Sequence, residues 1–193
     1  MPFVRRRQAA LALAIAVCLL SIGSLTATIV AEDGPSEAVL ILKGTTGEPI
    51  RLTATEFKKL PRTEVAAVDH AGNKAHYSGV ALRVLLDKVG VPAGEQLRGK
   101  WIASFVAVDA LDDYRAVFSL AEVDPAFNER TIILADQRNG QPLDKRHGPF
   151  RVIVPGEKRQ ARWIFGVREI RVIDSRAKEP WGRSLQDDLA PKQ

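Results

Sequence analysis

Short apolar segments of strand length, separated by turn residues, recur along most of this chain. Runs rich in Val, Ile and aromatic residues favour extended backbone when Gly, Pro, Asn or Asp residues bound them. The pattern predicts eight strands, over residues 38–44, 63–70, 75–79, 101–110, 114–120, 130–136, 149–155 and 168–174.

Two helices are predicted among these strands. Thr53 and Glu56 have the spacing of a capping box, and Pro61 ends what can only be a short helix. A second helix is predicted over residues 82–89, because its leucines fall on one face and Gly90 follows as a helix-ending glycine. Strands outnumber helices, and the helices do not alternate with them one for one. The predicted fold class is therefore α+β, a single domain on a mixed sheet, and not a doubly wound parallel sheet.

The beginning of the chain has the pattern of a targeting segment. Three arginines precede an apolar run, Ala9 to Ala31, that contains no charged residue, which indicates a signal peptide. The run is also long enough to cross a bilayer, since about 20 apolar residues suffice, so an uncleaved membrane anchor is the alternative. We expect a signal peptide or anchor over residues 1–31, a domain over residues 37–176 and a flexible tail over residues 177–193. An exported, periplasmic or otherwise extracytoplasmic protein is expected, with membrane contact only through an uncleaved N-terminal segment.

The high net charge belongs largely to this N-terminal segment. Removing residues 1–31 takes away three arginines and no acidic residue, so the formal charge falls from +5 to +2. So small a charge gives no support for nucleic-acid binding. The single cysteine, Cys18, lies inside the apolar run, so residues 37–176 contain no thiol and the domain must be held together by its core.

Basic residues are concentrated in the last third of the chain. Residues 145–176 contain nine Lys or Arg against three acidic residues, and Lys158, Arg159 and Arg162 crowd into one glycine-led loop. Guanidinium groups and loop backbone amides suit phosphate and other oxyanions, whereas an ordinary solvated surface produces a similar excess of charge. Both readings stay open. The nearby residues Phe150, Trp163 and Phe165 are expected to be core aromatics, because export makes single-stranded nucleic acid an improbable partner.

A metal site is one reading of the histidines. Asp69, His70 and His76 could meet across a hairpin, and imidazole with carboxylate suits zinc, copper or iron. The alternative is that these residues end one strand and begin the next, partly solvated. The alternative is favoured because no HExxH or CxxC spacing accompanies them. Nucleophile-elbow and phosphate-binding glycine patterns are also missing from the sequence.

Several distinctive segments follow one another between Val65 and Asp174. They are VDHAGN, YSGVALRVLLDKVGV, DDYRAVFSLAEV, TIILADQRNGQPLDKRHGPFRVIVPG and RQARWIFGVREIRVID. In this order and spacing, the chain resembles the molybdopterin-binding domain of the sulfite oxidase family. The resemblance implies a mixed α+β fold around a molybdenum and pterin cofactor, which catalytic relatives use for oxygen-atom transfer.

The resemblance also implies which residues hold the cofactor. Arg162, beside Trp163, matches the family's Lys/Arg-Trp pair near the pterin phosphate. Arg151 matches the arginine after Gly-Pro, and Asn73 matches the asparagine of the family's Cys-Ala-Gly-Asn turn. Lys158 is a further basic residue for the phosphate. These roles fit the chemistry, because a doubly charged phosphate needs guanidinium or ammonium groups around it.

The chain departs from the family at the metal ligand. His70 stands where catalytic relatives have the cysteine whose thiolate binds molybdenum, so His70 is assigned to the cofactor site and no metal ligand or catalytic residue is assigned. One expected function is an oxidoreductase-like cofactor binder that has lost this thiolate, with the pterin phosphate as ligand and a redox protein as partner. The other is a non-catalytic module that binds a small anion or a protein on the same fold. The expected cofactor is accordingly molybdopterin or none.

Overall fold

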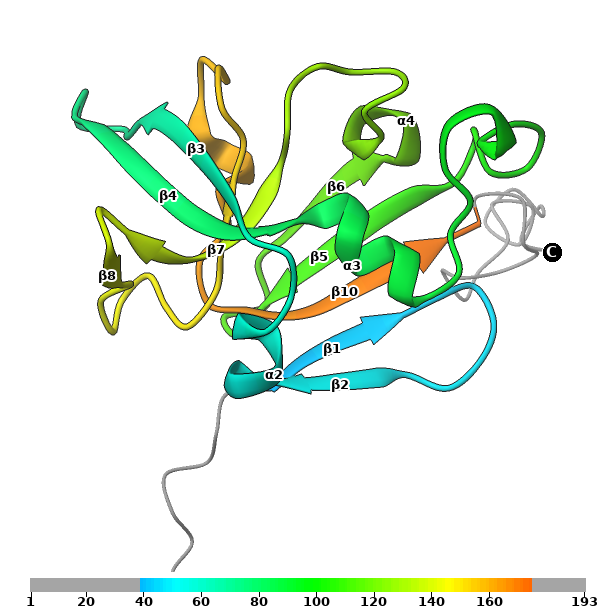
Figure 1. The fold of residues 1–193 in the computed structure, drawn as a ribbon, viewed down its shortest axis with the longest axis horizontal. Coiled ribbons are helices and arrows are strands. Elements are labelled where there is room, and N and C mark those ends of the chain that lie inside the picture. The colour runs from blue at the N-terminus through cyan, green and yellow to red at the C-terminus, as the bar shows by residue number, and fades with distance from the viewer. Residues whose placement is uncertain (1–38, 175–193) are drawn as a thin grey trace, which may run out of the picture. The chain divides into compact units, whose positions relative to one another are not determined.

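A mixed five-stranded sheet forms one half of the structure, a computed structural model that describes residues 39–174. Its strand order is β2, β1, β10, β5, β6, and the parallel pairing of β1 with β10 joins segments from opposite ends of the described chain. The other neighbours in this sheet are antiparallel. Figure 1 shows these strands side by side. In chain order they are β1 Val39–Lys43, β2 Ile50–Thr53, β5 Phe105–Ala110, β6 Arg115–Ser119 and β10 Val167–Ile173.

The second sheet is antiparallel, and its strand β7 pairs with three others. β7 pairs along one side with β4, and along its other side with β9 near its start and with β8 near its end. β3 and β4 form a hairpin whose turn, residues 69–73, contains His70 and Asn73. In chain order the strands are β3 Thr63–Val68, β4 Lys74–Ala81, β7 Ile133–Arg138, β8 Gln141–Pro142 and β9 Arg151–Ile153.

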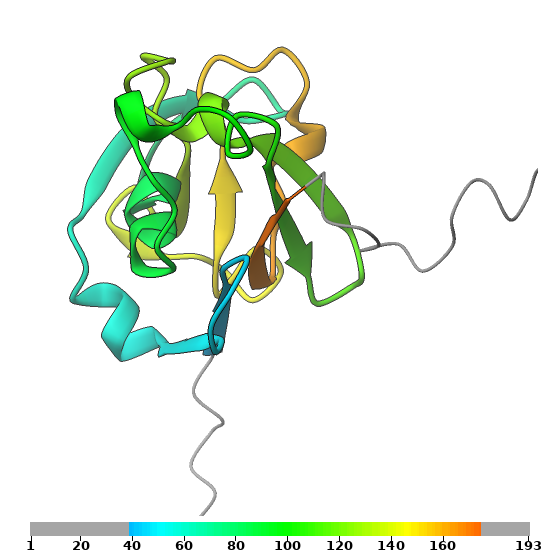
Figure 2. The same cartoon turned by 90° about the vertical axis from the view of Figure 1, so that its right-hand side faces the viewer.

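Short helices connect the strands. They are α2 Ala54–Lys58, α3 Leu82–Lys88, α4 Leu120–Val123 and the 3₁₀ helices η1 Gly94–Gln96 and η2 Gln160–Arg162. In α2 the predicted capping box is confirmed, because the Glu56 backbone N–H donates to Thr53 Oγ1 at 3.2 Å and the Thr53 backbone N–H donates to Glu56 Oε2 at 2.8 Å. Figures 1 and 2 show α2 at the opposite end of the domain from the loop that carries η2.

One hydrophobic core lies under both sheets. It contains Leu40, Val108 and Ile170 from the first sheet, Tyr77 and Leu134 from the second, and the inner face of α3. Both sheets therefore depend on the same buried surface, and the position of each is fixed by the other.

The predicted fold class is confirmed, and each predicted strand has a counterpart. Five short elements, β2, α4, β8, η1 and η2, were not predicted, and the strand expected over residues 101–110 begins only at Phe105. Residues 101–104 form a turn in which Ser104 Oγ donates to the Lys100 carbonyl oxygen at 2.9 Å. The proposed segments 1–31 and 177–193 lie outside the described residues. Within residues 39–174, no helix has the length and apolar character needed to span a membrane.

Candidate functional site

A cavity of about 360 Å³ opens between the turn joining β5 to β6 and the segment around η2. We call it the aromatic pocket; it is lined by Asp112, Tyr114, Gln160, Ala161, Trp163, Ile164 and Phe165. Asp112 and Tyr114 belong to the β5–β6 turn, in which the Ala110 N–H donates to the Tyr114 carbonyl oxygen at 2.9 Å. Asp112 Oδ1 accepts the Tyr114 backbone N–H at 3.1 Å, which fixes the carboxylate at the mouth of the turn.

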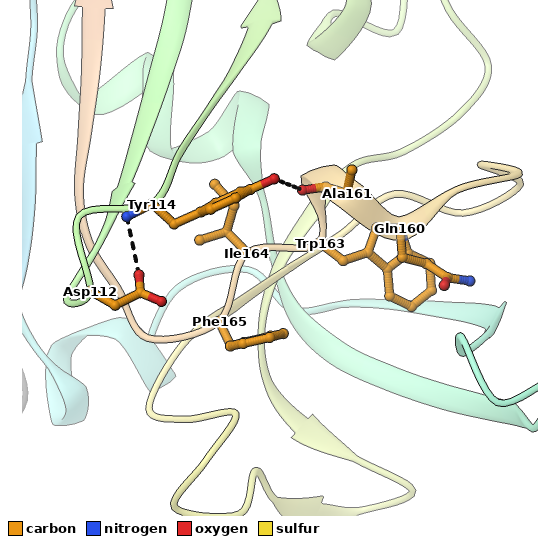
Figure 3. A pocket seen from close by; sticks show the side chains of 7 residues that line it. All are labelled: Asp112, Tyr114, Gln160, Ala161, Trp163, Ile164 and Phe165. Atoms are coloured by element: carbon orange, nitrogen blue, oxygen red, sulfur yellow. Dashed lines mark hydrogen bonds between the residues drawn. The ribbon is translucent and has the colours of Figure 1, made fainter.

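Two aromatic rings face each other across the aromatic pocket. Figure 3 shows Tyr114 and Phe165 on opposite sides, with the carboxylate of Asp112 near one end and Gln160 and Trp163 near the other. The Tyr114 hydroxyl donates to the Ala161 carbonyl oxygen at 2.8 Å, and Trp163 Nε1 donates to the Val154 carbonyl oxygen at 3.1 Å. These bonds hold the walls in place. The arrangement suits a planar ring, which would stack between aromatic faces and donate N–H groups to Asp112.

A second cavity of about 230 Å³ lies beyond Phe165 and is named here the arginine cavity. It is lined by Arg138, Asn139, Pro142, Leu143, Asp144, His147 and Arg151. The Arg151 guanidinium lies 5.5 Å from the Trp163 ring and 5.4 Å from the Phe165 ring, and only 6% of the residue is exposed. Within residues 39–174 its Nε has no hydrogen-bond partner, and burial lowers the pKa of the guanidinium. A buried donor without an acceptor is costly, so this cavity favours an acceptor-bearing ligand.

Phe165 is the wall between the two cavities. It lines the aromatic pocket, and it also contacts Arg151 and the His147 ring, whose centroid lies 5.3 Å away in a T-shaped arrangement. His147 is oriented by Asp144, since its Nδ1 lies 2.7 Å from Asp144 Oδ2, and this hydrogen bond lowers the pKa of Asp144. A ligand longer than one ring system could therefore reach from one cavity towards the other around Phe165.

Arg162, assigned to the pterin phosphate by resemblance, is already occupied. Its guanidinium donates to both oxygens of Glu122, at 2.8 and 3.0 Å, and its Nε donates to Glu157 Oε1 at 2.7 Å. It also lies 4.7 Å from the Phe118 ring. The hydrogen bonds with Glu122 and then Glu157 raise the pKa of Arg162. We call these three residues the Arg162 clamp.

The remaining predicted residues lie on the surface. His70, Asn73 and Lys158 are all exposed, and none of them lines either cavity. Asn73 stabilises the hairpin turn, where its backbone N–H donates to Asp69 Oδ1 at 2.9 Å.

The metal reading of the hairpin is not supported. Asp69 is nearly buried and forms an ion pair with Arg138, 2.7 Å between Oδ2 and Nη2, while His70 and His76 are exposed. In the part of the chain that the structure describes, no group of three or more His, Cys, Asp or Glu side chains is arranged to hold a metal ion. The carboxylate expected among the ligands is thus committed to an arginine.

Comparison with known proteins decides the family. The profile described as oxidoreductase molybdopterin binding domain matches residues 28–181, most of the chain. The chain belongs to this family. Among solved structures, the sulfane dehydrogenase SoxCD from Paracoccus pantotrophus is similar, with a TM-score of 0.56 and 22% sequence identity over 71% of this chain. The match covers 38% of the SoxCD chain, so it supports the fold. Curated proteins gave no significant match.

A molybdopterin cofactor has a molybdenum end and an organic pterin end, and the two fit the residues of this protein differently. No sulfur occurs in residues 39–174, because the only cysteine is Cys18 and the only methionine is Met1. His70, which the resemblance sets at the position of the thiolate ligand, is an exposed turn residue. The molybdenum end therefore does not fit the donors present. The organic end does fit, because the aromatic pocket suits a flat ring and the nearby Arg151 has an N–H without a partner among residues 39–174.

Sequence reasoning missed several cavity residues. Tyr114 was expected in a strand, and Asp112, Arg138, Asp144 and His147 were not assigned to any site. Phe150 and Trp163 are core aromatics as expected, but Phe165 is 39% exposed and lines the pocket. The one available signal was that a turn residue, Tyr114, is aromatic where turns usually carry polar residues.

Proposed function

We propose that this family member is a non-catalytic binding protein for an organic, planar heterocycle of the pterin class, held without molybdenum. The aromatic pocket takes the ring between Tyr114 and Phe165, and Asp112 accepts hydrogen bonds from ring or amino N–H groups. Arg151 donates to a carbonyl or anionic group on the same ligand. The proposal combines the family's pterin chemistry with the donor groups that this chain retains.

The observation that carries the proposal is the state of Arg151. Its guanidinium is nearly buried and stacked on two aromatic rings, and its Nε lacks an acceptor within the described residues. An arginine needed only for stability would be expected to find a carboxylate or carbonyl, as Arg162 does. A bound ligand that supplies an acceptor removes this desolvation penalty at the moment of binding.

A molybdopterin oxidoreductase is the second candidate, and family membership favours it. In catalytic relatives the bound metal centre supplies oxygen-atom transfer. That reading needs a metal ligand, and the exposed imidazole at residue 70 is a harder and more weakly held donor than a thiolate. Export through residues 1–31, and action outside the cytoplasm, stay part of the proposal. A redox partner protein belongs only to the second candidate.

The molybdenum and pterin contents of the purified protein distinguish the two functions. The full chain is produced in an exporting host that synthesises molybdopterin, and molybdenum is measured by mass spectrometry while released pterin is measured by fluorescence after oxidation. We expect pterin with less than one tenth of a molar equivalent of molybdenum, roughly the level of adventitious metal. Stoichiometric molybdenum together with pterin would refute the proposal and establish the second candidate.

Direct titration covers the case in which the ligand is lost during purification. Pterin fluorescence is followed as the full chain is added, with Tyr114→Ala as the variant that removes one wall of the pocket. We expect saturable quenching, and about tenfold weaker binding in the variant, because loss of one stacking face is equivalent to 1 to 2 kcal/mol. Absence of saturable binding would rule out the proposed function.

A further inference from the structure

Exposed apolar side chains gather around the mouth of the aromatic pocket. Leu111, Tyr114 and Phe165 are three of the eight large hydrophobic residues that are exposed within residues 39–174, and we call these three the apolar rim. Figure 3 shows Tyr114 and Phe165 at the pocket. Leu111 lies beside them, because its backbone N–H donates to the carbonyl oxygen of Gly166 at 2.9 Å. Exposed apolar residues that lie together mark a surface for a membrane or another protein, whereas scattered ones need no explanation.

Exposed basic residues flank the apolar rim on two loops. The loop before Gly148 reaches Phe165 through His147, whose ring centroid lies 5.3 Å from that of Phe165. The loop that carries η2 reaches the rim at Ala161, whose carbonyl oxygen accepts the Tyr114 hydroxyl at 2.8 Å. Each loop carries two exposed cations that form no ion pair within the described residues, and we call the four the basic flanks: Lys145, Arg146, Lys158 and Arg159.

Most acidic residues of the same segments are held by basic side chains. Among these carboxylates, Asp112 is the one without a basic partner in the described chain, and it accepts the Tyr114 backbone N–H. The charges free to meet a partner are therefore mainly positive, which suits a surface of anionic groups. The paired residues are Asp113 with Arg168, Asp144 with His147 and Glu157 with Arg162.

The described chain begins at the same end of the first sheet. β1 and β10 are parallel neighbours, with Ile41 opposite Glu169. Both strands therefore begin at one end of the sheet, and β10 begins directly after the segment that contains Phe165. The apolar run interpreted as a signal peptide or anchor ends at Ala31, and residues 32–38 join it to β1. So short a segment spans at most about 25 Å, so an uncleaved anchor would keep the apolar rim near the bilayer. This favours a membrane over a protein as the partner.

We infer that the apolar rim and the basic flanks form a docking surface for a membrane that contains anionic lipids. The rim enters the boundary between headgroups and acyl chains, and the flanks contact the phosphates. This contact belongs to the domain itself and is distinct from the spanning segment expected in residues 1–31. It does not depend on the ligand of the aromatic pocket, because Leu111, the most exposed member of the rim at 65%, does not line that pocket.

An environment-sensitive dye on the rim tests the inference in the full chain. Cys18→Ser removes the only thiol, and Leu111→Cys then carries the dye. The matched control is Ile102→Cys, because Ile102 is 45% exposed and precedes β5, whereas Leu111 follows it. With vesicles of phosphatidylcholine and phosphatidylglycerol we expect a blue shift for the dye at residue 111 and none at residue 102. Vesicles of phosphatidylcholine alone should bind about a hundredfold more weakly, because the basic flanks then meet no anionic surface.

Charge variants identify the residues that contact the lipid. Lys158→Gln combined with Arg159→Gln removes two cations and should weaken binding to the anionic vesicles about thirtyfold. Arg98→Gln combined with Lys100→Gln is the control, because these exposed cations lie in the loop that precedes β5, beside Ile102, and their removal should leave binding unchanged. Added salt should weaken binding less in the first variant than in the unmodified chain, since fewer charges remain to be screened. Melting temperatures verify that each variant is folded.

Several outcomes would overturn the inference. They are an unshifted dye at residue 111, an equal shift at residue 102, and equal binding of anionic and neutral vesicles. Unchanged binding in the variant of Lys158 and Arg159 would do the same. A blue shift that grows with protein concentration in the absence of lipid would identify a second copy of the chain as the partner instead. Pterin titration is scored separately, so loss of pterin binding removes the proposed function and leaves the membrane surface in place.

Discussion

His70, assigned to the position of the family's metal ligand by resemblance, contributes little to the fold. It is exposed in the β3–β4 turn, and it forms no ion pair within the described residues. We predict that His70→Ala changes the free energy of unfolding by no more than about 0.5 kcal/mol, as for other surface substitutions. Urea denaturation followed by tryptophan fluorescence measures it. A loss of several kcal/mol would mean that this side chain has a structural role.

The neighbouring Asp69, unlike His70, is expected to stabilise the fold, and this stabilisation depends on pH. Its carboxylate accepts the backbone N–H groups of Asn73 and Ala71 and pairs with Arg138, and the hydrogen bond from Asn73 is the first cause of its lowered pKa. Because the pKa of this carboxyl is lower in the folded state than in the unfolded state, its ionised form stabilises the folded protein at pH values above the ordinary pKa of 3.8. This stabilisation is lost as the pH falls through the pKa of the folded state. Asp69→Asn should therefore lower the urea midpoint at pH 7 more than at pH 3.

Gly79 is a residue whose importance the sequence did not reveal. At the irregularity between β4 and β7, a Cβ on Gly79 would lie 2.1 Å from the Leu134 carbonyl oxygen and 2.5 Å from the Ala135 Cα. Both contacts are with backbone, so the strands must separate. We predict that Gly79→Ala lowers the free energy of unfolding by about 3 kcal/mol. Ser78→Ala, one residue earlier, should change it by less than about 1 kcal/mol, and equal effects would contradict the steric explanation.

At the scale of the element, α2 shows what local sequence can establish. Its start was predictable because the capping box involves residues three apart, Thr53 and Glu56. We predict that Thr53→Ala lowers the free energy of unfolding by about 1 kcal/mol. The backbone N–H of Thr53, and then its hydroxyl, lower the pKa of Glu56 by donating to the carboxylate. The variant loses the hydroxyl and keeps the backbone N–H, so this pKa should rise part of the way towards its ordinary value of 4.5, measured by NMR titration. An unchanged Glu56 pKa would show that the cap does not persist in solution.

Other elements depend on partners that no local pattern contains. β2 has four residues and becomes a strand because β1 pairs with it, and α4 is a single turn that follows Ser119, whose Oγ accepts the Glu122 N–H at 3.0 Å. The Arg162 clamp joins residues 40 positions apart, Glu122 and Arg162. Basic residues in the sequence thus suggested an anion site, but only the fold decides which guanidinium is already satisfied and which is not.

At the scale of the whole molecule, the pattern of strands predicted the fold class. Which strands pair over long distances in the sequence could not be predicted. The parallel contact of β1 with β10 sets Leu42 opposite Ile170, and nothing in either segment specifies the other. The same holds for the site, since Tyr114 meets Ala161 only after β6 and the η2 segment are placed together. Family resemblance supplied the overall fold that local patterns could not, and the chain's own side chains then altered the site built on it.

The shared core implies that the two sheets unfold together. Leu134 is the second residue of β7, is fully buried, and belongs to the cluster that also contains Val108 and Ile170 of the first sheet. We predict that Leu134→Ala lowers the free energy of unfolding by about 3 kcal/mol, and that far-ultraviolet circular dichroism and tryptophan fluorescence still report one coincident transition. Val117→Ala, on the exposed face of β6, is the control and should change stability by less than about 1 kcal/mol. Separate transitions for the two probes would show that each sheet has its own stability, and the ligand site, which draws residues from both, would then assemble only on docking of the sheets.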